Sequence, residues 1–494
     1  MKPAYYAGQW DELRRNPDPE QLQSLAHRIA GNFIERYFYN DEYNEGYINL
    51  LCEMATQNQQ PELNQIAAAT LFSVVVERLC DDFEDLQTET YNRLICQVTG
   101  YLRGLPEGRD LDEKLEQFGL QSNLELFHRI ESIRLSPDRP LPHSFAPQKI
   151  LVLSRITIGA DVAVTSIICQ RMAQRYPAAE LVVFGNQKLY QVMDSDSGIR
   201  VNVLSYERRG GLLERFRTWL GLLQEVNAEI AGLAHNAYLL LDPDSRLTQL
   251  GVLPLVQEAN YRFFNSRGKA QYPEKGSISE LTNLWLNNIL AETEFAYPKV
   301  WPSAANCRIS ESFVRRHRNN RQTITINLGV GGNQRKRVPG EFETRLILTL
   351  LNIPGTRIML DRGFGHEELE RSQLILDAAT AAGFKVIQKS YADLEGCQDD
   401  FDLLGIECSV GEIATLIAVS QEFIGYDSAC QHIAAALGIK TFTVFAGTNN
   451  VRFIRRWHAC GPNASEILFV DTLSRDAVID ETELVQRLMD MRAQ

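Results

Sequence analysis

Residues 149–175 read KILVLSRITIGADVAVTSIICQRMAQR, and this stretch decides the fold class. It opens with a short, nearly continuous apolar run, which is typical of a strand buried on both faces of a parallel sheet. Gly159 follows the run, and residues 161–175 have the pattern of a helix. The stretch therefore predicts a strand, a turn and a helix, the repeating unit of α/β proteins.

The same alternation continues to the end of the chain. The runs AELVVFG, VNVLSY and AYLLLD follow first, and a second series consists of TITINLGVGG, TRIMLD, FKVIQKS, EFIGYD and TFTVFAG, with helices between them. The pattern predicts two Rossmann-like domains that face each other across a cleft, at residues 148–320 and 321–480. A C-terminal helix is expected over residues 481–494, with its apolar face against either domain.

Residues 1–135 follow a helical pattern instead. Leu22, Leu25, Ile29, Phe33 and Tyr37 recur at a spacing of three or four, and further helices are expected near 42–56, 62–79, 88–102 and 111–133. The segment SPDRPLPHSFAP at 136–147 carries four prolines and is predicted to be a linker. We expect residues 1–135 to form a separately folding all-helical domain that recognises a partner or an acceptor.

The charge and composition argue against a nucleic-acid-binding protein and against a membrane-spanning protein. The 494 residues carry a net charge of −13, which argues against a nucleic-acid-binding protein. Most of this charge lies in residues 1–147, which hold 24 acidic and 13 basic side chains. The longest uncharged apolar run, 66–76, is shorter than the roughly 18 residues of a membrane span.

The cysteines and the N-terminal residues indicate the cellular compartment of the protein. Nine cysteines are scattered without a CxxC pair, which favours free thiols in a reducing compartment over disulfides or a zinc site. No apolar leader follows Met1. We expect a cytoplasmic protein, with peripheral association at the inner face of a membrane as the alternative.

Two glycine-containing turns are candidates for binding an anion. Gly329, Gly331 and Gly332 follow a predicted strand and precede Arg335, Lys336 and Arg337. Residues 308–337 contain eight basic residues and one acid in an otherwise acidic chain, which points to an anionic ligand such as phosphate. The alternative is a tight turn with solvated charges.

The second candidate lies in EFIGYDSACQHIAAALGIKTFTVFAGTNN at 422–450. Asp427 and Ser428 are good N-cap residues, and a helix N-terminus at the carboxyl end of a parallel strand is suited to phosphate. His432 falls in the second helical turn, where a lone histidine is usually structural. Thr448 follows another small-residue turn at the same predicted sheet edge.

Asp161 has two possible roles in the first strand–turn–helix unit. It could cap the helix, or it could act as a general base that faces the cleft.

Together these motifs resemble glycosyltransferase family 9, the ADP-heptose:lipopolysaccharide heptosyltransferases and their relatives. The resemblance rests on Gly159 and Asp161, on Lys336-Arg337, on G-x-D-S-x-x-x-H-x-A-A-A-L-G at 425–438 and on F-x-G-T at 445–448, and it runs from about 149 to 450. It implies a GT-B fold, a nucleotide-sugar donor held mainly by the C-terminal domain, and an inverting reaction that needs no metal or other cofactor.

The resemblance also implies roles for individual residues. Asp161 corresponds to the base that deprotonates the acceptor hydroxyl, and Lys336 to the lysine that contacts the donor phosphate. The remaining donor-binding positions are Gly329, Gly331, Gly332, Arg337, Asp427, Ser428, Ala429, His432, Thr448 and either Glu367 or Glu368. The expected reaction moves a sugar, heptose being one candidate, from a nucleotide-diphosphate sugar to a glycan, lipid-linked or protein acceptor, as in bacterial glycan biosynthesis.

Four positions depart from the family pattern. One residue, Ala160, is inserted between Gly159 and Asp161, and Val338 replaces the usual tryptophan. Ala429 replaces the glycine of the usual D-S-G, and Gly447 replaces the usual proline. For this reason the identity of the donor is not carried over.

Two other interpretations compete with this one. Asp242-Pro243-Asp244 resembles the DxD motif of metal-dependent glycosyltransferases, although a turn is the favoured interpretation. The chain could also be a non-catalytic nucleotide-sugar-binding scaffold or an interaction protein.

Overall fold

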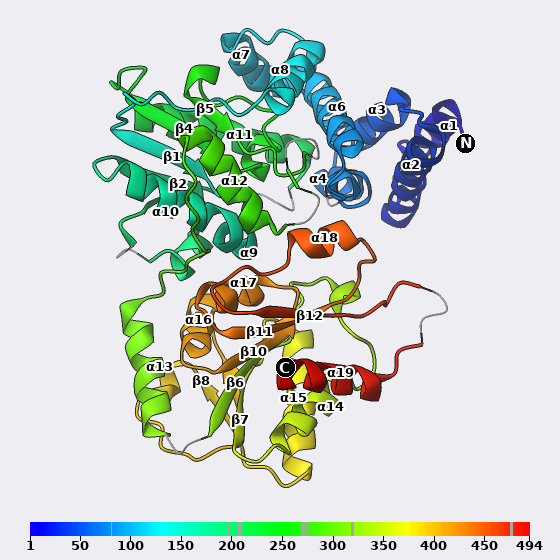
Figure 1. The fold of residues 1–494 in the computed structure, drawn as a ribbon. Coiled ribbons are helices and arrows are strands. Elements are labelled where there is room, and N and C mark those ends of the chain that lie inside the picture. The colour runs from blue at the N-terminus through cyan, green and yellow to red at the C-terminus, as the bar shows by residue number, and fades with distance from the viewer. Residues whose placement is uncertain are drawn as a thin grey trace.

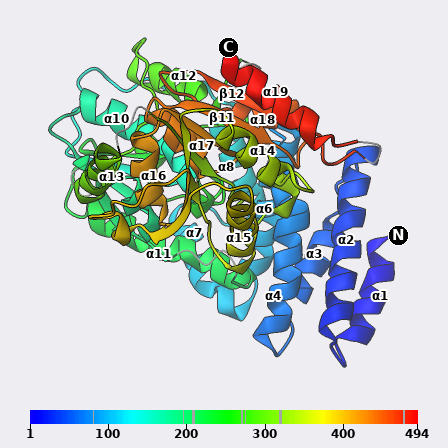
Figure 2. The same ribbon diagram turned by 90° about the horizontal axis from the view of Figure 1, so that it is seen from below.

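A helical part and two α/β parts make up the protein (Figure 1). The structure is a computed structural model, which describes residues 1–80, 82–194, 197–205, 210–268, 272–273, 276–317, 321–474 and 478–494. Seen from below, α1 to α4 project to one side of the α/β parts (Figure 2). The predicted class, an α/β fold preceded by helices, is confirmed.

The helical part contains eight α-helices in its described residues. They are α1 (Pro3–Leu13), α2 (Pro19–Asn40), α3 (Glu45–Met54), α4 (Pro61–Thr70), α5 (Glu77–Cys80), α6 (Asp85–Arg103), α7 (Arg109–Gln117) and α8 (Asn123–Leu135). The single helix expected over 111–133 is two helices. Gly119, with φ of +76°, follows the end of α7, and Ser122 and Glu125 form a capping box that begins α8.

One helical run is longer than the sequence suggests. A π-helical turn, Leu71–Val76, joins α4 to α5, so residues Pro61–Cys80 form 20 residues that pass a length and hydropathy test for a membrane span. Over half of the apolar window, 56%, is buried inside the protein, as is usual for a core helix. The test alone is weak support for a membrane span.

The first sheet has five parallel strands in the order β3-β2-β1-β4-β5. The strands are β1 (Lys149–Leu153), β2 (Glu180–Gly185), β3 (Arg200–Val203), β4 (Tyr238–Asp242) and β5 (Tyr261–Phe263). The associated helices are α9 (Ile158–Ala160), α10 (Ser166–Arg175), α11 (Leu212–Ile230) and α12 (Ile278–Leu290).

The second sheet has seven parallel strands in the order β12-β11-β10-β6-β7-β9-β8. The strands are β6 (Gln322–Asn327), β7 (Thr356–Asp361), β8 (Val386–Ser390), β9 (Leu403–Glu407), β10 (Glu422–Tyr426), β11 (Lys440–Phe445) and β12 (Ser465–Phe469). The helices are α13 (Ala304–Arg316), α14 (Phe342–Leu351), α15 (His366–Ala381), α16 (Val410–Ala418), α17 (Ala429–Ala436), α18 (Val451–Arg456) and α19 (Glu481–Ala493). α13 packs against α16, and α19 packs on α14.

The strand order of the second sheet indicates where a ligand would bind. β6 and β10 are parallel neighbours, and the strands that follow β6 continue on one side of this pair whereas those that follow β10 continue on the other, so the strand order reverses here. In open parallel sheets, ligands bind at the carboxyl ends of the strands where this reversal occurs. The turns after β6 and β10, which carry Lys336 and Asp427, therefore meet at the expected position.

The helical part shares a hydrophobic core with the first sheet. One continuous cluster includes Phe33 of α2, Leu94 of α6, Leu151 of β1 and Trp219 of α11. Within the predicted linker, Leu141 is buried and its N–H donates to Ile289 O at 2.7 Å. The segment 136–147 is thus fastened to the first α/β part.

The two carboxylates of the DxD-like turn stabilise the contact between the helical part and the first α/β part. Asp242 accepts hydrogen bonds from Thr248 and Tyr261, at 2.6 and 2.7 Å. Asp244 forms a buried ion pair with Arg267, at 3.0 Å, and the guanidinium lies over the ring of Tyr91 in α6. Both carboxylates are engaged by protein donors, which supports the interpretation of Asp242-Pro243-Asp244 as a turn.

We predict that Arg267→Met lowers the free energy of unfolding by about 3–5 kcal/mol, because removal of one partner leaves Asp244 buried without its counter-charge. Urea unfolding followed by circular dichroism measures this change. Arg109→Met is the matched control, since Arg109 is 83% exposed and pairs only at the surface. Equal stability of the Arg267→Met variant and the control would contradict the prediction.

Candidate functional site

A cleft of about 540 Å³ lies between the three parts of the protein. Its lining comes from α9, the turn after β4, the loop after β6, the start of α17, the turn after β11, α18 and the α5–α6 region of the helical part. Among the predicted residues, Gly331, Lys336, Asp427, Ser428, Ala429, His432 and Thr448 line it together. Most of the predicted donor-binding positions therefore meet in one place, although they come from distant parts of the sequence.

An ion pair connects the two main turns of the cleft. The Lys336 Nζ lies 2.6 Å from Asp427 Oδ2 and 3.2 Å from the carbonyl oxygen of Asp427. The other carboxylate oxygen of Asp427 accepts from Gln431 Nε2 at 2.7 Å. The lysine is about one-quarter exposed, so its ammonium group is available to an anion that enters the cleft.

Glycines permit the close approach of these turns. Gly331 and Gly332 have φ of +61° and +80°, and Gly447 has φ of +75°. A Cβ atom at Gly447 would lie 2.3 Å from the carbonyl oxygen of Arg335. The glycine that replaces the family's usual proline thus allows the turn after β11 to touch the loop that carries Lys336.

The N-terminus of α17 opens into the same cleft. Ser428 is the N-cap residue, and its side chain makes no capping hydrogen bond. The backbone N–H groups of the first helical turn carry partial positive charge and favour an anion at this end. Lys336 and the α17 N-terminus together form a site suited to phosphate.

His432 is held neutral by burial. It lines the cleft and is 4% exposed, and desolvation lowers the pKa of its imidazole to about 4. The ring packs edge-on against Trp457 at a centroid distance of 6.0 Å. The Nδ1 atom has no hydrogen-bond partner in the part of the chain that the structure describes.

Gly159 lies where the two sheets approach each other. A Cβ atom at this position would lie 3.1 Å from Ala429 Cα and 3.2 Å from His432 Cδ2. Such contacts are tighter than ordinary packing allows, so a larger residue would separate α9 from α17. The glycine predicted from the sequence to permit close approach faces the start of α17.

The structure places Asp161 behind the surface of the cleft. Thr157, Gly159 and Ala160 line the cleft, whereas the Asp161 carboxylate is 1% exposed. Its oxygens accept from Ser154 Oγ, Arg155 N and Thr165 Oγ1, each at 2.7 Å. Burial raises the pKa of Asp161 to about 6, against the opposing effect of these hydrogen bonds.

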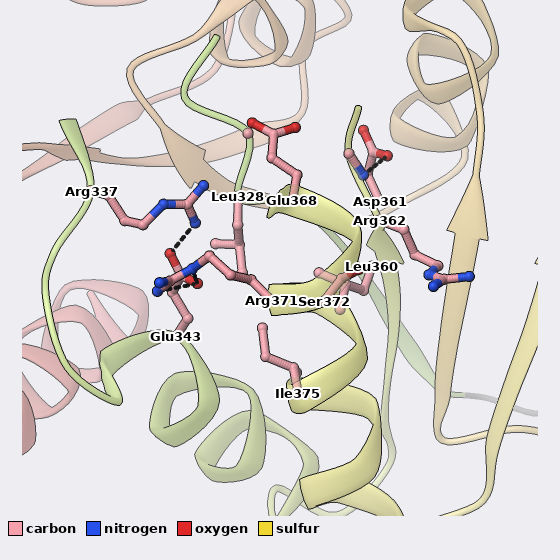
Figure 3. Close-up of a pocket in the computed structure, with 12 residues that line it drawn as sticks. Leu328, Arg337, Glu343, Leu360, Asp361, Arg362, Glu368, Arg371, Ser372 and Ile375 are labelled. Carbon is pink, nitrogen blue, oxygen red and sulfur yellow. Dashed lines mark hydrogen bonds and ion pairs between the residues drawn. The ribbon is translucent and has the colours of Figure 1, made fainter. Parts of the chain in front are cut away.

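Arg337 and Glu368, one of the two candidate glutamates, line a small cavity of the second α/β part (Figure 3). Glu368 accepts from Val330 N and Phe364 N, at 3.2 and 2.8 Å, and thereby joins the loops after β6 and β7. Glu367 is exposed and accepts from Gln334 Nε2 at 2.5 Å. Gly329 lines this cavity rather than the main cleft.

A buried charge network positions the loop that carries Lys336. Glu343 of α14 accepts from Arg337 at 2.7 Å, from Tyr426 at 3.0 Å and from Arg371 at 3.2 Å, and Figure 3 shows both arginines directed at its carboxylate. The Tyr426 hydroxyl accepts from Val338 N at 3.2 Å. The loop is therefore attached to β10 next to the Lys336–Asp427 pair.

The sequence did not indicate every residue in the lining. Phe453 and Trp457 come from α18, Arg246 follows β4, and Glu77 and Asp82 come from the helical part. None of these residues belongs to a recognisable motif. The helical part is separated from the family-like motifs by the segment 136–147, so only the folded chain brings it to the cleft.

Metal ligands are not gathered in the described ranges. No group of three or more His, Cys, Asp or Glu side chains there could hold a metal ion. All nine cysteines are free thiols.

We predict that Glu343→Gln speeds hydrogen exchange at the Val338 amide by about tenfold or more, since a hydrogen bond to a charged group contributes about 1.5–3 kcal/mol. The substitution removes the charge that holds Arg337 and the Tyr426 hydroxyl in place. Mass spectrometry of the peptide that contains Val338 measures the rate. Glu370→Gln is the control, because Glu370 lies at an exposed position of α15. Equal exchange rates at Val338 in the two variants would show that Glu343 does not stabilise the loop that carries Lys336.

Comparisons with known proteins agree with this geometry. The model of glycosyltransferase family 9 (heptosyltransferase) matches residues 290–473. A family 9 glycosyltransferase from Veillonella parvula is 14% identical over 72% of this chain and 99% of its own, with a TM-score of 0.50, which is a likeness of fold.

Two other solved structures are similar over a comparable length. E. coli heptosyltransferase WaaC with ADP is 15% identical, covers 69% of this chain and 99% of its own, and has a TM-score of 0.45. The structure of E. coli ADP-heptose lipopolysaccharide heptosyltransferase II is 14% identical, and the match covers 70% of this chain and 99% of that one, with a TM-score of 0.42. No curated protein sequence matches the chain. The chain is thus similar to glycosyltransferase family 9 in the sequence of residues 290–473, and it shares its fold with a solved member of that family.

Proposed function

We propose that the protein is an inverting, metal-independent glycosyltransferase that uses a nucleotide-diphosphate sugar as its donor. The observation that carries the proposal is the meeting of Lys336 with the N-terminus of α17 in a cleft at the carboxyl ends of β6 and β10. ADP-heptose is one candidate donor among nucleotide sugars. The proposed acceptor is a glycan, a lipid-linked saccharide or a protein. The proposed location is the cytoplasm, including the inner face of the membrane.

The charges of the cleft suit a departing diphosphate. Lys336 supplies a positive charge, and the first turn of α17 supplies N–H donors and the positive end of the helix dipole. An incoming diphosphate competes with Asp427 for the lysine. Because protein groups meet the negative charge, the proposed transfer step requires no divalent cation.

Asp161 is the proposed base. An inverting transfer needs one group to take the proton of the acceptor hydroxyl while the sugar is attacked from the face opposite the diphosphate. A carboxylate with a pKa of about 6 is suited to this role near neutral pH. To reach an acceptor hydroxyl, the carboxylate must first release the hydrogen bond that it accepts from Ser154 or from Thr165. The alternative role of Asp161 is structural, because these same hydrogen bonds connect β1 with the helix that follows.

We predict that Lys336→Ala lowers turnover by about 100- to 1000-fold, because a positioned charge no longer stabilises the departing diphosphate. Release of nucleoside diphosphate from ADP-, GDP-, UDP- and dTDP-sugars, measured in EDTA, tests both this role and metal independence. Lys385→Ala is the control, since Lys385 is exposed and pairs with Asp400 at the surface. Wild-type turnover in Lys336→Ala would refute the phosphate role, and loss of wild-type activity in EDTA would refute metal independence.

We predict that Asp161→Asn loses transfer by a factor on the order of 10²–10⁴ while donor affinity is kept, because an amide cannot accept the proton. Wild-type kcat/KM should fall as the pH drops below about 6, where the carboxyl becomes protonated. The folded-state pKa is above the unfolded value, so Asp161 favours folding at low pH and this contribution is lost as the pH rises toward 6.

The pH dependence of stability provides the control for that variant. Asp161→Asn should flatten the decline of the melting temperature between about pH 4 and pH 6 that this carboxyl causes. A variant with that flattened profile and full transfer activity would show that Asp161 has a structural role only.

A further inference from the structure

The turn between β1 and α9 contains a residue in an unfavourable backbone conformation. Ile156 has a φ of +72°, in the left-handed region, and no other β-branched residue of the described ranges has a positive φ. A β-branched residue is an outlier there, because its Cβ atom comes too close to the following carbonyl oxygen. Such conformations persist only where surrounding contacts impose them, and they cluster at functional sites. Ile156 directly precedes Thr157, which lines the cleft.

Hydrogen bonds on both sides of Ile156 impose this conformation. Its N–H donates to Ser154 Oγ at 2.8 Å, and its carbonyl oxygen accepts from Asn186 Nδ2 at 3.3 Å. The side chain of Arg155 donates to the carbonyl oxygen of Pro243 at 2.8 Å. The turn is therefore held by the segments that follow β2 and β4, and these contacts offset the cost of the left-handed conformation.

The same turn covers the carboxylate of Asp161. Ser154 Oγ, which accepts from Ile156 N, donates to Asp161 Oδ2 at 2.7 Å. Arg155 N donates to Asp161 Oδ1, also at 2.7 Å. Two of the hydrogen bonds that hold the carboxylate behind the cleft surface thus come from the two residues directly before Ile156. If the backbone at Ile156 turns to the extended region, its N–H leaves Ser154 Oγ and this cover is disrupted.

We propose that Ile156 is a positioning residue, whose left-handed conformation keeps Asp161 covered and whose change to an extended conformation uncovers the carboxylate for the acceptor hydroxyl. This inference rests on the proposed function, in which Asp161 takes the proton of the acceptor. The extended conformation is the intrinsically preferred one for a β-branched residue. The strain released at Ile156 therefore offsets part of the free energy needed to break the hydrogen bond between Ser154 and Asp161.

Two variants separate the strain from the loss of the side chain. Ile156→Gly and Ile156→Ala both remove the packing of Ile156 against the core, but only glycine adopts a positive φ without steric cost. We expect Ile156→Gly to have the higher melting temperature of the two. Hydrogen exchange at the Arg155 amide should be about tenfold slower in Ile156→Gly, because opening of the turn no longer releases strain. Mass spectrometry of the peptide that covers 154–161 measures this rate without any substrate.

Turnover provides a readout that strain without a functional role would not change. Release of nucleoside diphosphate from ADP-, GDP-, UDP- and dTDP-sugars, with water as the acceptor, gives kcat and the KM for the donor. We expect kcat of Ile156→Gly to be about tenfold below that of Ile156→Ala, with the same KM, because Asp161 is uncovered in fewer molecules.

Ala291→Gly is the control, since Ala291 is an exposed residue with a φ of +53° at the end of α12. Relief of strain there should raise the melting temperature and leave kcat and exchange at Arg155 unchanged. Ile156→Asn and Ile156→Val replace the first pair if those variants fail to fold, because asparagine tolerates the left-handed region whereas valine is β-branched.

Each result decides between the two roles of Ile156. Equal exchange at Arg155 in Ile156→Gly and Ile156→Ala, equal kcat in the two, or a lower melting temperature in Ile156→Gly overturns the positioning role. Absence of diphosphate release from every nucleotide sugar in the wild type overturns the proposed function instead, and the exchange measurement still decides whether strain at Ile156 drives the opening of the turn.

Discussion

The ion pair between Lys336 and Asp427 joins two turns that are 91 residues apart in the chain. It exists because β6 and β10 are neighbours in a parallel sheet, so their carboxyl ends deliver both turns to one edge. Lys336 lies on a loop of mostly exposed residues, which buried Glu343 braces from the other side through Arg337 and Tyr426. The pair therefore fixes the loop after β6 to the turn after β10.

The helical part depends on the same arrangement. Its core is continuous with that of the first sheet, and Asp244, Arg267 and Tyr91 connect the two parts in a buried cluster. The segment between its helices α5 and α6 contacts Asn450 and Arg452 of the α18 region through Asp82 and Glu84. The helical part therefore contacts both α/β parts and links them directly.

Local patterns in the sequence predicted most of the fold, and the failures have physical reasons. Continuous apolar runs revealed buried strands such as β1 and β10, whereas β5, β9 and β12 were missed. β12 is mostly partly exposed at the sheet edge and β5 has only three residues, but β9 is buried and its short run, interrupted by Gly405, was not recognised. The apolar spacing of 111–133 continues through the break between α7 and α8, where the left-handed Gly119 lies. The motif residues that meet in the cleft were predictable, but Glu77 and Asp82 were not, because only tertiary packing places them there.

Asp161 lies behind the cleft surface because its hydrogen bonds hold it at the end of β1, where Ser154 Oγ and Arg155 N donate to its carboxylate. An extra residue would turn the following side chains by about 100° around a regular α-helix. A π-helical turn over Asp161–Thr165 comes directly after Ala160, the residue that the family pattern lacks, and α10 continues from it in regular form. Such a turn is a way to accommodate one additional residue within a helix. Burial at this position raises the pKa of Asp161 to about 6, so the feature that removes the carboxylate from the surface also gives it the proton affinity that the proposed base requires.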